Sequence, residues 1–253
     1  MTWQLRRIFG GLMLGALVAG QAIAADEEAR ALMKRTFDQA RITFRAKMQL
    51  RSPGGLVRDL VVSHRQEGDA SSTYMEITAP FNLKDTRFLS YDHASGEDEH
   101  FTYVPMVKRS MRVPQWTLEQ SFLGSDFYMI DIAIPDMEKY EYKLDGQATY
   151  EGSSCRRVIS QPREPEGEPY RRIIYCVDET KWISLSTEYF DENEKLLKTW
   201  RPIRMEKVED IWTPIKQSMR NVQSETESEL EILDIQYRVE LDDELFGKAH
   251  LDR

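Results

Sequence analysis

The chain has 253 residues, of which 41% are hydrophobic, and this length suits one large β domain or two small ones. Its 43 Asp and Glu outnumber its 34 Lys and Arg, so the formal net charge is −9 at pH 7. Because nucleic-acid binding needs clustered basic residues to contact phosphates, this balance argues against a nucleic-acid-binding protein.

The N-terminus has the order of a secretory signal peptide. Arg6 and Arg7 precede an apolar run from Ile8 to Val18, and small residues follow it. The run is too short to cross a bilayer comfortably, and no later stretch is long and apolar enough to do so. We therefore predict that residues 1–24 are a signal peptide, cleaved after about Ala24, and that the mature chain is exported as a soluble protein without an integral membrane segment.

The mature chain, residues 25–253, begins with one predicted amphipathic helix. Asp26 is placed to cap a helix that continues to about Ala40. Apolar residues recur at helical spacing and leave the charged residues on the other face, so we expect the helix to pack over a sheet. These residues are Ala29, Leu32, Met33, Thr36, Phe37 and Ala40.

From Ile42 the pattern changes to the alternation that is typical of β-strands. Every second residue from Ile42 to Leu50 is apolar, which gives one buried and one solvated face. Similar segments follow with short connections, so we expect a mostly antiparallel sheet. The further predicted strands are residues 56–65, 71–79, 86–92, 99–104, 140–144, 148–151, 154–160, 170–178, 183–190, 196–208, 212–221 and 233–239, and a helical turn is expected at 242–246.

A single sheet of ten or more strands with one apolar face must close on itself, pair with a second sheet, or have its concave face covered. Only the helix at 26–40 and the irregular segment at 115–131 are available as covers. We therefore predict a mainly β (α+β) fold, in which one strongly curved antiparallel sheet forms an incomplete barrel with helices over its concave face. A filled barrel is the alternative, because it would produce the same alternation.

Two cysteines, Cys155 and Cys176, predict a disulfide in an exported protein. The strands around them flank a loop rich in Pro, Glu and Gly. Folded as a hairpin centred on that loop, Cys155 lies directly opposite Cys176 and Arg157 opposite Ile174, close enough for a bridge. A redox or metal role for the pair is the minor alternative.

No catalytic template is found in the sequence. None of the four histidines has HExxH spacing, no serine lies in GxSxG, and no glycine-rich phosphate loop follows a strand. We therefore predict no catalytic residue and no metal site, and a hydrolase of lipid substrates is the disfavoured alternative, because no nucleophile, base or metal set is visible. The best metal cluster surrounds a turn of a kind that is common between strands; it comprises Asp92, His93, Asp98, Glu99 and His100.

Residues 101–131 depart from the strand pattern and combine aromatic, basic and acidic groups around prolines and a glycine. An apolar segment such as Phe122–Tyr128 is more often core than ligand wall. In a segment that covers a concave sheet, however, the two roles coincide, and an unfilled apolar cavity suits an acyl chain. The candidate ligand contacts here are Phe122, Leu123, Phe127 and Tyr128.

A basic cluster, Lys108, Arg109 and Arg112, precedes this apolar segment. We expect these side chains to form a solvated face or to pair with Asp126 or Asp131. The functional alternative is contact with an anionic lipid head group or with an acidic partner. An ion pair between Asp126 and one of the arginines would latch the covering segment.

Several short blocks stand in a fixed order along the chain. They are Tyr74-Met75-Glu76-Ile77, Asp85-Thr86-Arg87-Phe88-Leu89, Tyr103-Val104-Pro105, Lys108-Arg109, Arg112 and Ser121-Phe122-Leu123-Gly124-Ser125-Asp126-Phe127. This ordered set resembles the outer-membrane lipoprotein-sorting protein family, which consists of LolA-like periplasmic proteins. The resemblance implies an incomplete antiparallel barrel whose helices cover a hydrophobic cavity for acyl chains, with no cofactor and no catalysis.

On this basis we predict a periplasmic carrier that binds acyl chains of a lipid or lipoprotein for transport toward the outer membrane. An inner-membrane lipid exporter of the resistance-nodulation-division (RND) type is a candidate partner. The alternative is a periplasmic sensor or regulator that binds a lipid signal or a partner protein. The predicted cavity and lid residues are Phe88, Tyr103, Phe122, Leu123, Phe127 and Tyr128, and the predicted head-group or latch residues are Arg109, Arg112 and Asp126.

Overall fold

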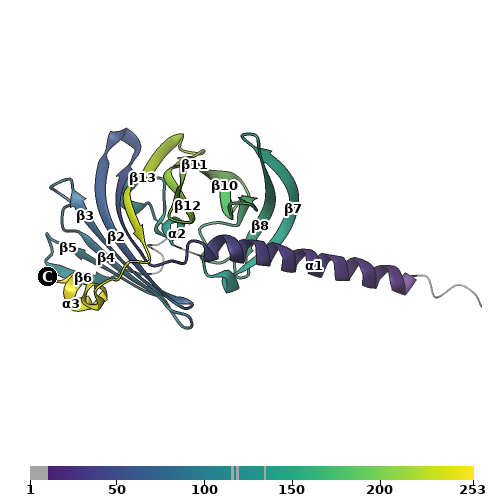
Figure 1. Ribbon diagram of the computed structural model, residues 1–253, viewed down its shortest axis with the longest axis horizontal. Coiled ribbons are helices and arrows are strands. Elements are labelled where there is room, and N and C mark those ends of the chain that lie inside the picture. Colours follow the sequence, from purple (N-terminus) through teal and green to yellow (C-terminus); the bar gives the residue numbers. More distant parts are fainter. Residues whose placement is uncertain (1–10, 115–116, 118–119, 134) are drawn as a thin grey trace, which may run out of the picture.

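The computed structural model of the chain describes residues 11–114, 117, 120–133 and 135–253, with side chains from residue 25 onward. Its main element is one 13-stranded antiparallel sheet, in the order β6-β5-β4-β3-β2-β1-β13-β12-β11-β10-β9-β8-β7. In the described part of the chain, the two edge strands, β6 and β7, do not pair with each other, so the sheet does not close into a barrel. Figure 1 shows that the sheet is strongly curved. The prediction of a single curved antiparallel sheet that forms an incomplete barrel is confirmed.

Strands are the main elements of the chain, and the helices and 3-10 turns are mostly short. The helices are α1 (Gly11–Asp38), α2 (Met129–Ile132) and α3 (Lys248–Leu251), and the 3-10 turns are η1 (Pro53–Gly55), η3 (Phe122–Gly124), η4 (Met137–Lys139) and η5 (Asp243–Phe246). The strands are β1 (Phe44–Arg51), β2 (Val57–Glu67), β3 (Ala70–Ala79), β4 (Arg87–Asp92), β5 (Glu99–Val104), β6 (Arg109–Arg112), β7 (Tyr140–Tyr150), β8 (Ser153–Pro162), β9 (Arg172–Asp178), β10 (Ile183–Phe190), β11 (Leu196–Val208), β12 (Ile211–Asn221) and β13 (Thr226–Tyr237).

Helix α1 begins earlier than its apolar periodicity predicts. It runs without a break from Gly11, so Asp26 lies inside the helix and does not cap it. Figure 1 shows the first part of α1 extending beyond the sheet. Within the part of the chain that the structure describes, no helix combines the length and apolarity needed to cross a bilayer. Arg6 and Arg7 of the predicted signal peptide lie outside the described residues, and its cleavage stays a prediction.

Three strand predictions need correction, and in two of them a register irregularity is the cause. β7 is one strand where two were predicted, because a register shift between Leu144 and Gln147 interrupts the alternation without ending the strand. β13 begins at Thr226, and an irregularity opposite Lys47 and Met48 leaves Leu233 57% exposed. The segment Arg109–Arg112, which was predicted to depart from the strand pattern, forms the short edge strand β6.

The main hydrophobic core lies on the inner side of the curved sheet. Ala29, Leu32 and Met33 of α1 pack there in one cluster with Phe122 and Phe127 and with inward-facing strand residues. Burial of these side chains supplies most of the stabilisation, at about 25 cal/mol per Å² of apolar surface. The predicted packing of the first helix over the sheet is confirmed.

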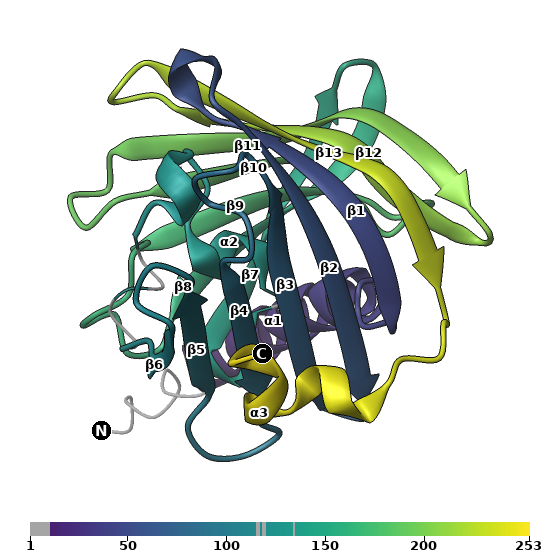
Figure 2. The ribbon, with the colours of Figure 1, turned by 90° about the vertical axis from the view of Figure 1, so that its left-hand side faces the viewer.

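A second cluster covers the outer face of the β3–β5 wing. Tyr74 and Leu89 are buried there against Phe246 and Leu251 of the C-terminal segment. Figure 2 shows this segment lying across the strands on their outer side. Because successive residues of a strand point to opposite faces, the residues next to these in sequence point inward.

The predicted disulfide between Cys155 and Cys176 is present, with a Cα–Cα distance of 5.3 Å. The predicted register of its hairpin is wrong by two residues. Arg157, not Cys155, lies directly opposite Cys176, and Ile159 lies opposite Ile174. The bridge therefore joins β8 and β9 diagonally.

Candidate functional site

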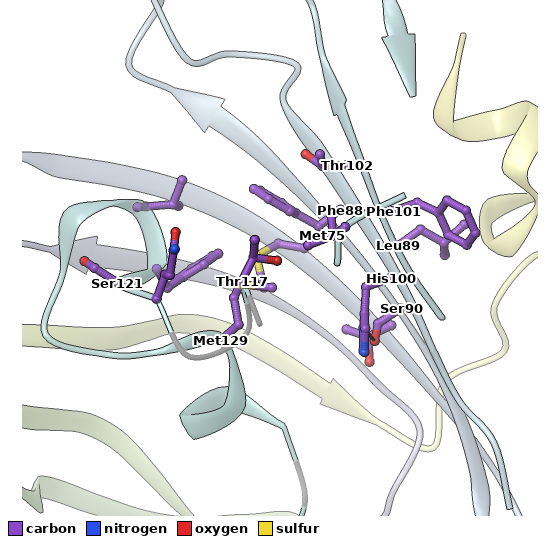
Figure 3. Close-up of a pocket in the computed structure, with 15 residues that line it drawn as sticks. Met75, Phe88, Leu89, Ser90, His100, Phe101, Thr102, Thr117, Ser121 and Met129 are labelled. Carbon is purple, nitrogen blue, oxygen red and sulfur yellow. Dashed lines mark hydrogen bonds between the residues drawn. The ribbon is translucent and has the colours of Figure 1, made fainter. Parts of the chain in front are cut away.

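The concave side of the sheet is crossed by residues 120–133, which we call the covering segment; it contains η3 and α2. A cavity of about 270 Å³ lies between this segment and strands β3–β5 (Figure 3). Its wall is mostly apolar. The lining residues are Thr73, Met75, Phe88, Leu89, Ser90, His100, Phe101, Thr102, Val113, Thr117, Gln120, Ser121, Phe122, Leu123 and Met129.

The apolar part of the wall follows from the alternation of β3 and β4. Met75 and Phe88 lie directly opposite each other on the inner face of the sheet. In Figure 3 they point to one side of the strands, whereas Leu89 points to the other. Across the cavity, the ring of Phe122 meets that of Phe88 edge to face, with centroids 5.8 Å apart. This pair joins the covering segment to the sheet by dispersion and ring-edge contact alone.

One polar group of the wall has an unused hydrogen-bonding atom. His100 Nδ1 lies 2.7 Å from Ser90 Oγ, while its buried Nε2 has no hydrogen-bond partner among the described residues. Burial lowers the pKa of His100, although the nearby carboxylates of Asp92 and Asp98 oppose this. The neutral imidazole is thereby favoured, and its Nε2 is buried within the wall.

The backbone of η3 brings Leu123 to the cavity through two consecutive left-handed residues. Leu123 has φ 53° and Gly124 has φ 70°. A Cβ on Gly124 would meet Arg58 only at an ordinary 3.8 Å, so it is the backbone angle that favours glycine. Leu123 has no such freedom, and this conformation costs it roughly 1–2 kcal/mol.

Asp126 fastens the covering segment to β13. Its carboxylate accepts hydrogen bonds from the hydroxyls of Thr226 and Ser228, the latter at 2.6 Å, and its N–H donates to Ser228 Oγ at 2.9 Å. The predicted latch between Asp126 and an arginine is therefore replaced by a hydroxyl anchor. Arg109 and Arg112 are exposed on β6, at the edge of the sheet, whereas Asp126 is buried against β13 in its middle.

A second anchor is wholly buried. Lys198 Nζ of β11 lies 3.4 Å from Asp131 Oδ2 and 3.1 Å from the hydroxyl oxygen of Tyr170, and both ionic side chains are at most 1% exposed. Tyr170 donates to Asp131 Oδ1 at 2.7 Å, and Asp131 Oδ2 also accepts the N–H of Tyr128 at 2.7 Å. The cation lies over the ring of Tyr128, 2.8 Å from its centroid.

Burial shifts the pKa values of this anchor against its charged forms. It lowers the pKa of Lys198 to about 8, although the charge of Asp131 opposes the shift. It raises the pKa of Asp131 despite the nearby Lys198. The sequence analysis missed Lys198, although a signal was available: in the strand predicted at 196–208 it has the same parity as Leu196 and Trp200, which places it on the apolar face.

The acidic and histidine groups of the β4–β5 turn are engaged by neighbouring groups. Asp98 accepts the N–H of His93 at 3.0 Å, and Glu99 lies 3.4 Å from Lys248 Nζ and 3.7 Å from His93 Nε2. Within the part of the chain described, no group of three or more His, Cys, Asp or Glu side chains is arranged to hold a metal ion.

The six predicted cavity and lid residues lie in three environments. Three of them line the cavity: Phe88, Phe122 and Leu123. Phe127 is buried in the main core, and Tyr128 packs against Lys198. Tyr103 lies on the outer face of β5, in the cluster under the C-terminal segment, with the Arg87 guanidinium 5.1 Å from its ring centroid. Their role in ligand binding stays a prediction.

The architecture is that of a LolA-like open half-barrel, and solved structures share it. A domain described as outer membrane lipoprotein-sorting, from Vibrio parahaemolyticus, superposes with a TM-score of 0.83 at 22% identity, over 90% of this chain and 100% of that one. A DUF1329 family protein from Desulfovibrio piger gives 0.82 at 21% identity, over 90% and 99%. A LolA superfamily protein from Nitrosomonas europaea gives 0.69 at 17% identity, over 88% and 98%. At these identities the likeness establishes the fold.

A family model that carries the description "uncharacterized protein" matches residues 69–253, and the chain belongs to that family. The matched region begins just before β3, so it includes every strand of the cavity wall and the whole covering segment. No curated protein matches the sequence.

Proposed function

We propose that the protein is a non-catalytic carrier that holds an acyl chain of a lipid or lipoprotein in the cavity between β3–β5 and the covering segment. The cavity itself is the observation that carries the proposal: it is an apolar space of about 270 Å³ in a sheet that does not close. Transfer of an acyl chain from water into such a space gains about 0.8 kcal/mol per CH₂ group.

The position of the polar group favours an amphiphilic ligand. His100 and Ser90 lie on the β4–β5 wall, whereas Phe122, Leu123 and Met129 approach from the covering segment. An acyl chain packed against the apolar residues would direct its polar end toward the part of the wall that carries Ser90 and Thr102. The likeness to a lipoprotein-sorting domain supports the same class of ligand.

We place this carrier in the periplasm, with residues 1–24 removed, and infer transport toward the outer membrane. An RND-type lipid exporter in the inner membrane would be its donor. These inferences rest on the signal-like N-terminus and on the lipoprotein-sorting resemblance.

The test is to purify the exported protein from the cells that make it, extract it with organic solvent and identify bound lipids by mass spectrometry. A stoichiometric acyl lipid, or saturable uptake of a fluorescent fatty-acid probe by the delipidated protein, is expected. Protein that carries no lipid and takes up no probe would contradict the proposal. A stoichiometric protein partner without lipid would instead favour a sensor or regulator.

A further inference from the structure

Three turns leave the same end of the β1–β6 wing. Arg51 lies opposite Val57, Asp59 opposite Ala79, and Arg87 opposite Tyr103. In an antiparallel sheet this register places the β1–β2, β3–β4 and β5–β6 turns at one end of their strands. Figure 2 shows them at the upper ends. Because adjacent strands lie about 4.8 Å apart, successive turns of this set are separated by roughly 10 Å.

Each of these turns exposes a large apolar side chain. Phe81 is 94% exposed and Met106 92%, while Leu56 is 60% and Val107 54% exposed. Phe81 and Met106 are at the tips of their turns and are almost completely surrounded by solvent. Such side chains contribute nothing to the fold, and their clustering at one end points to a partner that removes them from water.

The same turns carry unpaired positive charge on a protein whose net charge is −9. Lys84 and Lys108 are exposed, as is Arg109 at the start of β6. Among the described residues, none of the three forms a salt bridge, and they lie together at one end of the sheet. The acid in these turns is Asp85, which is half-buried. We call these three cations and the apolar residues Leu56, Phe81, Met106 and Val107 the turn rim.

We propose that the turn rim docks on the surface of an anionic lipid bilayer, with its apolar tips inserted at the level of the head groups and its cations against the phosphates. Apolar side chains flanked by Lys and Arg are the combination that anionic membrane surfaces retain. A fluid bilayer accepts separate tips about 10 Å apart, whereas a protein partner requires a continuous complementary surface. The proposal rests on these turns alone and is independent of the cargo in the cavity.

The experiment is flotation of the exported full protein with vesicles of phosphatidylcholine alone and with vesicles that contain phosphatidylglycerol. We expect binding to the anionic vesicles that weakens as salt is raised. Removal of the two exposed tips in the double variant Phe81→Ser/Met106→Ser should lower the partition coefficient at least tenfold. Lys108→Gln should lower it about fivefold. A single Phe81→Trp reporter should show a blue-shifted emission with anionic vesicles, which reports insertion.

Two control variants distinguish binding through the turn rim from non-specific binding of exposed apolar or basic residues to vesicles. Leu233 on β13 is a 57% exposed apolar residue outside the turn rim, and Lys143 on β7 is an exposed cation on the opposite edge strand that matches Lys108. Leu233→Ser and Lys143→Gln should leave binding within twofold, and the variants should all keep the wild-type thermal midpoint.

The proposal is overturned if the protein does not bind anionic vesicles, or if the rim variants bind as the controls do. It is also overturned if sedimentation shows a dimer that Phe81→Ser dissociates, because the rim would then cover a second copy. Loss of vesicle binding in a rim variant with unchanged uptake of the fatty-acid probe would confirm that docking and cargo binding are separate.

Discussion

On the β11–β13 side, the covering segment is held by buried ionic and hydroxyl groups, whereas on the β3–β5 side it faces a cavity of about 270 Å³. Asp131 and Asp126 make directed bonds to Lys198 and to Ser228. Across the cavity, the closest ring contact is the edge-to-face pair of Phe88 and Phe122. The covering segment is therefore fixed on its β11–β13 side, and on its β3–β5 side it has room for a ligand.

The difference has a physical basis. A buried charged group that loses its partner is costly, so the anchored side tolerates little displacement. Dispersion contacts fall off gradually and can be replaced by contacts to a ligand, so the cavity side tolerates more. We therefore expect ligand entry to displace residues near Leu123 and to leave Asp126 and Asp131 in place.

The largest expected effect is at the ionic anchor. Lys198→Met should lower the free energy of unfolding by about 3–5 kcal/mol, because it leaves the Asp131 carboxylate buried without its cation. Urea denaturation followed by far-UV circular dichroism measures it. The matched control is Lys198→Met combined with Asp131→Leu, which should recover most of the loss. A single variant as stable as wild type would show that the pair does not hold the segment.

Asp126→Ala should cost about 1–3 kcal/mol, because the hydroxyl of Ser228 loses its buried acceptor. Arg112→Ala is the control: Arg112 is exposed and should change the free energy of unfolding by less than about 0.5 kcal/mol. Equal losses of unfolding free energy in the two variants would instead support an ion pair between Asp126 and Arg112. Both free energies come from the same urea titrations, and the sheet is expected to stay folded in each variant.

The pH dependence of stability should also report on the buried Lys198. The pKa of Lys198 falls to about 8 in the folded chain from 10.5, so the unfolded chain binds more protons at this residue between those values. The free energy of unfolding should therefore rise from pH 8 to 10, by about 2 kcal/mol. Above pH 10 the tyrosines oppose this, because burial raises the pKa of Tyr170 and Tyr189.

The control for this pH effect is Lys198→Met, in which the rise should disappear. A wild-type stability that stays flat or falls between pH 8 and 10, measured by urea titration at each pH, would contradict the account. Burial also raises the pKa of Asp131, and the stability that this contributes at low pH is lost as pH rises above 3.8.

The smallest effect on stability is expected on the cavity side. Leu123→Gly removes a cavity-lining side chain but also relieves a left-handed backbone at φ 53°. The two changes should nearly cancel, to within about 1 kcal/mol. Thermal unfolding would check this, with Leu123→Ala as the control that loses the side chain and keeps the strain. A loss from Leu123→Gly as large as that of the anchors would remove the distinction between the two sides.

Much of the fold was predictable because period-two alternation is a local signal. β5 and β10 have the predicted bounds, and β11 does also. The errors arise where pairing changes the register: the exposed Leu233 beside β1 and the shifted disulfide hairpin depend on a partner strand that the sequence does not specify locally.

The site was less predictable, for a related reason. The composition of residues 122–128 identified the covering segment, and the family resemblance supplied Phe88. The partners of Asp126 and Asp131 lie far away in sequence, on β13 and β11, so spacing could not find them. Tyr103 was misplaced because an aromatic residue on a short strand fits either face until the C-terminal segment is seen to cover the outer one.

The central claim is that this cavity binds an acyl chain, and the most direct test is a fluorescent fatty-acid titration of two matched variants. Met129 lines the cavity from α2, whereas Met48 on β1 is also half-buried but does not line it. Met129→Trp should fill part of the cavity and weaken probe binding at least tenfold, about 1.4 kcal/mol, while Met48→Trp should change it less than twofold. Equal affinity for the probe in Met129→Trp and wild type would place the ligand elsewhere and contradict the account.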